Sequence, residues 1–253
     1  MLFPIGDDDR SLSGPAYITI LLVAANVLIF LIQLANPAVS TAWAVIPREI
    51  ATGQDLVGVE QIVTSRGVAE IRHFPGPTPI YLTLLFAMFM HGGVMHILGN
   101  MIYLWIFGDN VEHRFGAFPF LLFYLISGLV GSLAHVAVDP GSTVPSLGAS
   151  GAISGVLGAY LVLFPRNRVH AVVFYMIVSI PAIAAIGIWI VFQFINGLGS
   201  IVYTSQTGGI AYAAHIGGFF AGVVLALIMR VVIREEKVNV FTRFESADSR
   251  RWW

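Results

Sequence analysis

The chain has 253 residues, of which 57% are hydrophobic and only 11% are charged. A soluble domain usually carries about 25% charged residues, so this composition excludes a soluble globular protein and indicates one that is solvated by lipid. The net charge of −1 gives no reason to expect nucleic-acid binding, and the absence of cysteine excludes disulfides, thiolate chemistry and cysteine-based zinc sites.

The N-terminal segment 1–15 contains three aspartates and one arginine before the first apolar run. It lacks the basic region and the small-residue cleavage site of a signal peptide, so we expect the first run to be a retained span. Apolar runs of roughly transmembrane length then recur along the chain and predict an all-α polytopic membrane protein with six transmembrane helices. These runs are 16–35, 93–108, 117–138, 150–165, 171–195 and 212–233.

A long polar connection, 36–79, separates the first two runs. Its prolines argue against a continuous helix, so we expect amphipathic or irregular structure at the membrane surface. We treat 16–233 as one membrane domain, followed by a charged tail at 234–253 that we expect in the cytoplasm.

The basic residues predict the orientation of the chain. With a cytoplasmic N-terminus, the inner connections hold Arg114, Arg166 and Arg168, and the tail adds several more basic residues. The outer loops 139–149 and 196–211 contain no Lys or Arg, although the first connection holds three arginines that go against the trend. We therefore predict that both termini are cytoplasmic.

Three polar side chains on different runs fall at a common depth. Measured from the charged residue at the inner end of each run, Ser150 lies about 24 Å, His215 about 22 Å and His96 about 20 Å along its helix. In a hydrocarbon core about 30 Å thick, all three lie roughly 6–10 Å below the outer face. Asn100 shares a helical face with His96 because the two are four residues apart. Polar residues at such depths are costly and are functional candidates.

This set of side chains is suited to nucleophilic catalysis. A serine nucleophile needs a base to take its proton and donors to hold the oxyanion that forms. We predict Ser150 as the nucleophile and His215 as the base. The predicted donors are His96, Asn100 and the backbone N–H of Ser150. No acid is placed to orient the base, since nothing ties the outer-loop Asp139 to His215, so we predict a Ser–His dyad.

Other interpretations of these residues stay open. Ser, His and Asn side chains also form interhelical hydrogen bonds in membrane bundles. A metal site built from His91, His96 and His215 would lack a carboxylate and the HExxH pattern, and the first two are spaced so that they point away from a common face. We therefore predict no metal and no cofactor. His135 is an alternative base, which we expect at the membrane interface near Asp139.

Four motifs in this order resemble those of the rhomboid intramembrane serine proteases. They are HGGVMHILGN at 91–100, GDNVEHRFG at 108–116, GASG at 148–151 and AHIGGFFAG at 214–222. The resemblance implies a rhomboid-like bundle of six transmembrane helices. It also implies Ser150 as the nucleophile, His215 as the base, and His96 and Asn100 as side chains of the oxyanion hole.

The resemblance further implies supporting roles for residues around these four. The positions are His91, Glu112, Gly116, Gly148, Gly151, Gly218 and Gly222. Glu112 and Gly116 match a structural motif at the inner end of the second run. The last two glycines would let the sixth helix approach the fourth, where we expect Gly151 and Gly155 as their counterparts.

Two features depart from the family pattern. Many members have an aromatic residue four positions after the nucleophile, where it packs on the catalytic histidine, and this chain has Ser154 there. Support for His215 is therefore expected from elsewhere. The Trp-Arg pair of the first loop is also absent, because Trp43 is followed by Ala44, so the docking of 36–79 is not predicted.

The sequence thus predicts an intramembrane serine endopeptidase that cleaves transmembrane protein substrates in or near their membrane segment. Its expected partners are these substrates and the lipid bilayer, with no nucleic acid. We expect it in a bacterial cytoplasmic membrane, with the active site open to the outer side. Two alternatives are a catalytically inactive rhomboid-like protein that binds membrane clients, and a small transporter, for which the sequence lacks inverted repeats.

Overall fold

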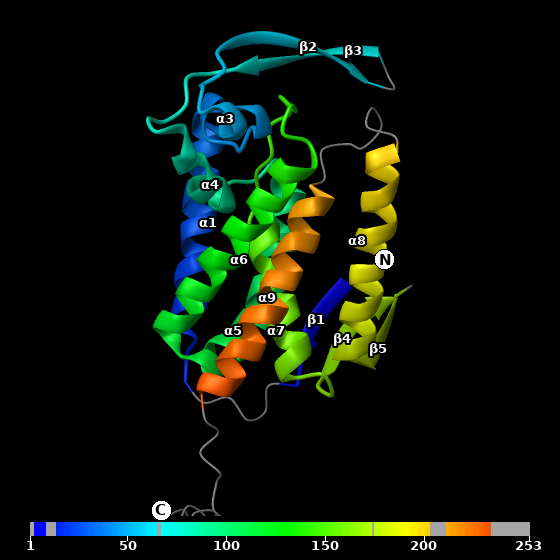
Figure 1. The fold of residues 1–253 in the computed structure, drawn as a ribbon. Coiled ribbons are helices and arrows are strands. Elements are labelled where there is room, and N and C mark those ends of the chain that lie inside the picture. Colours follow the sequence, from blue (N-terminus) through cyan, green and yellow to red (C-terminus); the bar gives the residue numbers. More distant parts are fainter. Residues whose placement is uncertain (1–2, 9–13, 65–66, 174, 203–210, 234–253) are drawn as a thin grey trace, which may run out of the picture.

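The computed structural model describes all residues except 1–2, 9–13, 65–66, 174, 203–210 and 234–253, so the predicted tail lies outside the described residues. The described chain is a helical bundle with two small sheets (Figure 1). The helices are α1 (Tyr17–Ala35), α2 (Ala38–Ala42), α3 (Pro47–Thr52), α4 (Thr83–Phe86), α5 (Val94–Phe115), α6 (Ala117–Val138), α7 (Ser150–Leu163), α8 (Ala182–Val202) and α9 (Tyr212–Val232), with 3-10 turns at Ile80–Leu82 and Ala87–Phe89. The strands are β1 (Phe3–Asp7), β2 (Gly58–Thr64), β3 (Gly67–His73), β4 (Arg168–Val173) and β5 (Met176–Pro181).

Three helices of the described chain, α1, α6 and α9, are long and apolar enough to cross a membrane. The short helices from Ile80 to Phe89 form a fourth candidate with α5, although the pair is bent by 75°. Two apolar helical segments are shorter, namely α7 and Ala182–Gly197 within α8. The 14 residues of α7 reach about 21 Å, less than a hydrocarbon core of about 30 Å. The six-span count is therefore not confirmed and stays a prediction.

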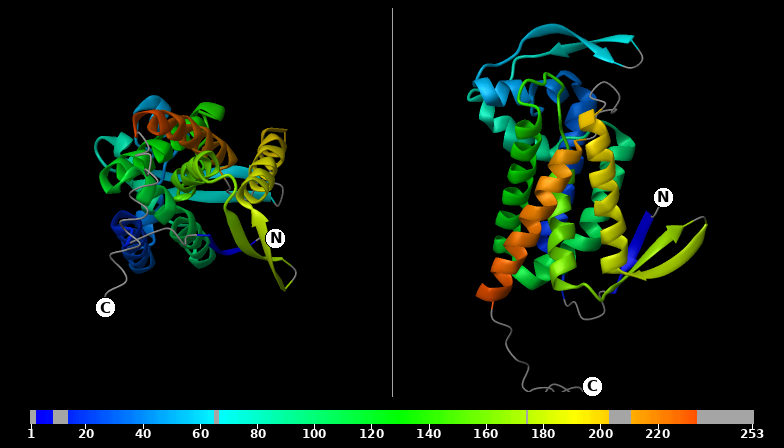
Figure 2. Two further views of the ribbon diagram at one scale, coloured as in Figure 1. Left: turned by 90° about the horizontal axis from the view of Figure 1, so that it is seen from below. Right: turned by 45° about the vertical axis from the view of Figure 1, so that its right-hand side comes forward.

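The transmembrane helix predicted at 171–195 is wrong in its first half, because β4 and β5 form a hairpin there. The hairpin is rich in β-branched valine and isoleucine, which favour strands, and Tyr175 in its turn has a φ of 67°. Helix α8 begins directly after Pro181, whose ring is tolerated at a helix start but not inside a helix. The N-terminal strand β1 pairs antiparallel with β4 to complete a three-stranded sheet at one end of the bundle (Figure 2). An all-α description therefore omits the strands.

The connection 36–79 contains the hairpin β2–β3, which was not expected, as well as the short helices α2 and α3. Figure 1 shows this hairpin across the end of the bundle opposite to the three-stranded sheet. Val45 and Ser146 exchange two backbone hydrogen bonds of 2.8 Å, and the N–H of Arg48 donates to the carbonyl of Ser142 at 3.0 Å. The connection is therefore docked on the loop that leads into α7.

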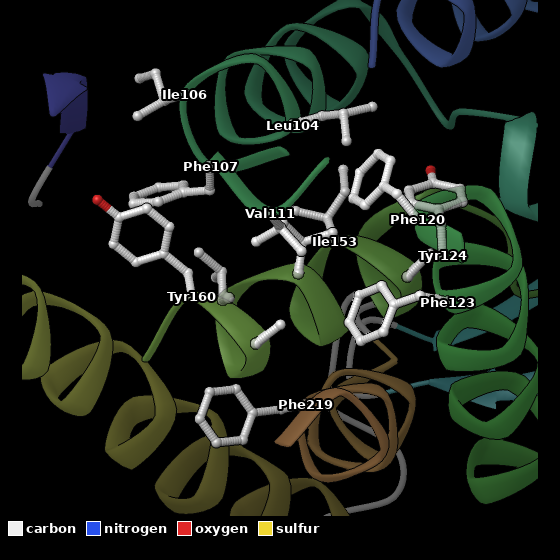
Figure 3. Close-up of a cluster of buried hydrophobic side chains, with 14 of the residues drawn as sticks. Leu104, Ile106, Phe107, Val111, Phe120, Phe123, Tyr124, Ile153, Tyr160 and Phe219 are labelled. Carbon is white, nitrogen blue, oxygen red and sulfur yellow. The ribbon is translucent and has the colours of Figure 1, made fainter. Parts of the chain in front are cut away.

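Helix α7 lies in the middle of the bundle, and every residue from Gly151 to Tyr160 is buried. Figure 3 shows aromatic and branched side chains of α5, α6 and α9 gathered around it. A helix that is small and apolar on all faces is buried on all faces, which explains the central place of α7. By contrast, large apolar side chains such as Leu28 and Val224 are exposed on α1 and α9, as expected for surfaces that contact lipid.

Glu112, near the end of α5, caps the beginning of α1. Its Oε1 accepts the backbone N–H of Ile18 at 2.9 Å, and its Oε2 accepts the N–H and the hydroxyl of Thr19 at 2.7 and 2.8 Å. These N–H groups have no intrahelical partner, and a negative charge is favoured at a helix N-terminus. Gly116 then ends α5 with a φ of 84°, a conformation that favours glycine and lets α6 follow at once.

We expect Glu112→Ala to destabilise the bundle by about 2–4 kcal/mol, because it leaves buried donors of α1 without an acceptor. The midpoint of thermal unfolding in detergent should fall by several degrees. Glu70→Gln on the exposed face of β3 is the matched control and should leave the midpoint unchanged. Equal midpoints for Glu112→Ala and the wild type would show that this cap does not stabilise the fold.

Candidate active site

Ser150 and His215 meet at neighbouring helix ends. Ser150 is the first residue of α7, and His215 lies in the first turn of α9. The hydroxyl Oγ of Ser150 is 2.7 Å from Nε2 of His215. A serine at this distance from an imidazole can transfer its proton to the ring as it attacks an electrophile.

The two helices approach so closely because glycines face one another. A Cβ added at Gly218 would lie 2.0 Å from the carbonyl oxygen of Gly151, and one at Gly222 would lie 2.0 Å from that of Gly155. Larger residues cannot fit at these distances, which is the packing logic of small residues in membrane helices. The structure therefore brings together the glycine pairs expected from the sequence, and their contact sets the distance between α7 and α9.

Gly148 has no room for a side chain. Its φ of 141° disfavours residues with a Cβ, and an added Cβ would lie 3.0 Å from the ring of His96 and 3.5 Å from Oγ of Ser150. Its N–H donates to the carbonyl of Ala87 at 2.9 Å, which ties the loop to the segment before α5. The backbone of this loop is thus held against Ser150.

His96, in the first turn of α5, has a defined proton position. Its Nδ1 accepts the backbone N–H of Gly92 at 3.2 Å. A neutral imidazole carries one proton, so Nε2 bears it and is a donor. Because Nε2 is the side of the ring that faces Gly148, His96 presents an N–H next to Ser150.

Asn100 lies one turn further along α5 and is 8% exposed. Its Nδ2 is buried and has no hydrogen-bond partner among the described residues. A buried amide donor without a partner is costly and is found where a ligand or water takes the hydrogen bond. Ser150 itself adds a third donor, since the backbone N–H groups in the first turn of a helix have no intrahelical acceptor.

A cavity of about 20 Å³ opens beside Ser150. Its polar walls include Ser132 and His135 of α6 and Ser146 of the preceding loop. A space of this size holds about one water molecule, and these side chains supply the polar partners that a bound water needs. His135, the alternative base of the sequence analysis, thus lines the cavity, whereas the hydrogen bond to Ser150 is made by His215.

The Rhomboid domain family matches residues 80–231, more than half of the chain and the region that carries all of these side chains. The chain belongs to the rhomboid family. Similar proteins include Rhomboid protein 1, mitochondrial, of Saccharomyces cerevisiae, which is 30% identical over 169 residues that cover 62% of this chain and 44% of the relative.

Two further rhomboid relatives come from a bacterium and an animal. Rhomboid protease GluP of Bacillus subtilis is 38% identical over 144 residues, 57% of this chain and 26% of the relative. Presenilin-associated rhomboid-like protein, mitochondrial, of Mus musculus is 30% identical over 164 residues, 60% of this chain and 40% of the relative. This chain therefore spans less than half the length of each of these relatives.

In this rhomboid chain, helix α8 supports the imidazole of His215. Oε1 of Gln193 is 2.7 Å from Nδ1 of His215. The ring of Trp189, also on α8, has its centroid 6.2 Å from that of the imidazole, with an interplanar angle of 35°. Tyr212, at the start of α9, lies edge-on to the imidazole with 6.4 Å between the ring centroids. The aromatic support that is missing at Ser154 is thus supplied by Trp189 and Tyr212.

Sequence reasoning did not find Gln193 and Trp189. A signal was present, because Gln193 is a polar residue inside an apolar run and stands four residues after Trp189, so both lie on one helical face. Ser154 is engaged within its own helix instead, where its hydroxyl donates to the carbonyl of Ser150 at 2.6 Å.

His91 contacts His96 of the candidate site. Gln33 of α1 holds the backbone of His91, accepting its N–H at 2.9 Å and donating to its carbonyl at 3.2 Å. The imidazole of His91 meets that of His96 edge-on, with 5.2 Å between the ring centroids, and meets Phe30 on another side. His91 therefore packs behind one of the candidate oxyanion donors.

Proposed function

We propose that this rhomboid-family protein is an intramembrane serine endopeptidase that cleaves membrane-spanning proteins through Ser150 and His215. The observation that carries the proposal is the 2.7 Å contact between Oγ of Ser150 and Nε2 of His215 at the start of a buried helix. The name of the Bacillus subtilis relative, a rhomboid protease, supports the same activity.

In the first half of the reaction, Oγ of Ser150 attacks the carbonyl carbon of the scissile peptide bond while its proton passes to Nε2 of His215. The carbonyl oxygen becomes an oxyanion, and the donors suited to it are Nε2–H of His96, Nδ2–H of Asn100 and the backbone N–H of Ser150. The imidazolium of His215 then gives its proton to the leaving amine, the C–N bond breaks, and an ester to Ser150 remains.

In the second half, a water molecule attacks the ester while His215 takes one of its protons. The ester bond breaks, the proton returns to Oγ of Ser150, and the new carboxyl terminus is released. The cavity lined by Ser132 and His135 is suited to hold such a water next to Ser150, or to receive a small side chain of the substrate.

The site's depth in the membrane is also part of the proposal. Helix α7 is too short to cross the hydrocarbon core, so at least one of its ends lies below a membrane surface. We infer that this is the end at Ser150, because Arg166 and Arg168 closely follow the other end. The distribution of basic residues favours a cytoplasmic N-terminus and therefore an active site that opens to the outer side. A substrate segment would reach it by unwinding near its outer end, because a peptide bond inside a helix is shielded from attack.

The proposal is tested with the wild-type protein reconstituted in liposomes with a single-span substrate protein. We expect cleavage of the substrate, and we expect a fluorophosphonate probe to label one residue, which mass spectrometry should locate at Ser150. If the wild type neither cleaves the substrate nor is labelled by the probe, the protease is refuted. That result would favour the alternative, an inactive rhomboid-like protein that binds membrane clients.

A further inference from the structure

Gln193 of α8 is the hydrogen-bond partner of the imidazole nitrogen that faces away from Ser150. The two ring nitrogens of His215 are each engaged, with Nε2 at 2.7 Å from Oγ of Ser150 and Nδ1 at 2.7 Å from Oε1 of Gln193. Gln193 lies on α8, is half-buried, and contacts His215 at the beginning of α9. No step of the proposed reaction uses this side chain directly.

The oxygen of a carboxamide decides which nitrogen of the ring carries the proton. A neutral imidazole has one N–H and one lone pair, and a carbonyl-type oxygen can only accept. With Oε1 at Nδ1, the proton of His215 must reside on Nδ1, which leaves the lone pair of Nε2 directed at Ser150. The opposite tautomer would place two acceptors against each other at Nδ1 and could not take the serine proton.

Among the described residues, the side chains that contact the imidazole of His215 through their rings do not make this choice. Trp189 and Tyr212 contact the imidazole through their rings, which restrict the plane of the imidazole but do not distinguish its nitrogens. Ser154 donates its hydroxyl to the carbonyl of Ser150. The partner at Nδ1 is thus a neutral carboxamide, which orients the base without adding a negative charge beside it.

We propose that Gln193 is a positioning residue for His215, which holds the base in the tautomer that accepts the Ser150 proton. The proposal rests on the protease function proposed above. It makes the base depend on α8, because the oxygen that selects the tautomer comes from that helix rather than from α7 or α9.

The test compares variants of Gln193 in the reconstituted full-length protein, by substrate kinetics and by the rate of fluorophosphonate labelling. Gln193→Met keeps the length and shape of the side chain but removes the acceptor. We expect kcat to fall by about 10- to 100-fold, a part of what general base catalysis contributes, with KM nearly unchanged. The labelling rate should fall by a similar factor, because labelling also requires the activated serine.

Two further variants separate the acceptor from packing. Gln193→Glu keeps an acceptor oxygen at the same reach and should restore kcat to within about threefold of the wild type. Gln193→Asn keeps the carboxamide but is one methylene shorter, so it should resemble Gln193→Met. The matched control is Asn196→Leu, since Asn196 is exposed on α8 and donates to the carbonyl of Phe192 in its own helix. This control should behave as the wild type.

The results with these variants support or overturn the positioning role of Gln193. An active wild type with an unchanged kcat in Gln193→Met would overturn the positioning role and leave the protease intact. A change in KM alone, or equal losses in the Met and Glu variants, would also overturn it, because these results indicate substrate access or packing. A wild type that neither cleaves nor labels would refute the protease itself and the positioning role with it.

Discussion

Ser150→Ala is expected to lower the rate of substrate cleavage by about 10⁴- to 10⁶-fold, because in the proposed reaction it removes the atom that attacks the peptide bond. The hydroxyl of Ser150 is the group 2.7 Å from the base, and a methyl group there cannot form the ester intermediate. Cleavage of a single-span substrate in liposomes measures the effect. Labelling by the fluorophosphonate probe should disappear in the same variant.

Ser154→Ala is the matched control for this prediction. Ser154 lies one turn further along α7 and its hydroxyl is bonded to the backbone of its own helix, so its loss should change the cleavage rate by less than about threefold. His215→Ala should lose activity as Ser150→Ala does, since the two side chains act as a unit. Full activity in Ser150→Ala, or loss in Ser154→Ala alone, would refute the assignment of the nucleophile.

Gly218→Ala is expected to reduce cleavage by about 100-fold or more without touching either reactive side chain. The added Cβ would lie 2.0 Å from the backbone oxygen of Gly151, so α7 and α9 must move apart. His215 stands three residues before Gly218 on α9, and a displacement of about 1 Å is enough to break a hydrogen bond to Ser150 and to cost activity on this scale. The rate of cleavage and the midpoint of thermal unfolding should both fall.

Gly187→Ala serves as the matched control for the glycine contact. Gly187 also lies in an apolar helix, α8, but a Cβ added there meets no atom within 4 Å. Its activity and midpoint should equal those of the wild type. An active Gly218→Ala protein would mean that α9 can shift without disturbing the pair, and that the close contact does not position the base.

Much of the bundle could be predicted because the relevant signals are local. The apolar runs at 16–35, 117–138 and 212–233 correspond closely to α1, α6 and α9, since the length of an apolar stretch is a property of consecutive residues. A common depth for Ser150 and His215 could be predicted by counting residues along each helix, because helical rise converts position into depth.

The prediction was wrong where apolar character did not distinguish a strand from a helix. The residues that form β4 and β5 are mostly apolar, like those of a membrane helix. The strand that completes their sheet, β1, lies near the N-terminus and is far from them in the sequence. The docking of the first connection could not be predicted either. It depends on a backbone contact between Val45 and Ser146, which carries no side-chain signature.

The amino-acid sequence by itself determined that this is a membrane protein of the rhomboid type, and it predicted a nucleophile, a base and their common depth. Tertiary packing decided how the pair Ser150 and His215 is supported. Gln193 and Trp189 reach His215 because α8 presents one particular face to α9, and Glu112 reaches the start of α1 from the end of α5. The rotation of each helix about its axis depends on all the surfaces packed against it, so these contacts exist only once the bundle has assembled.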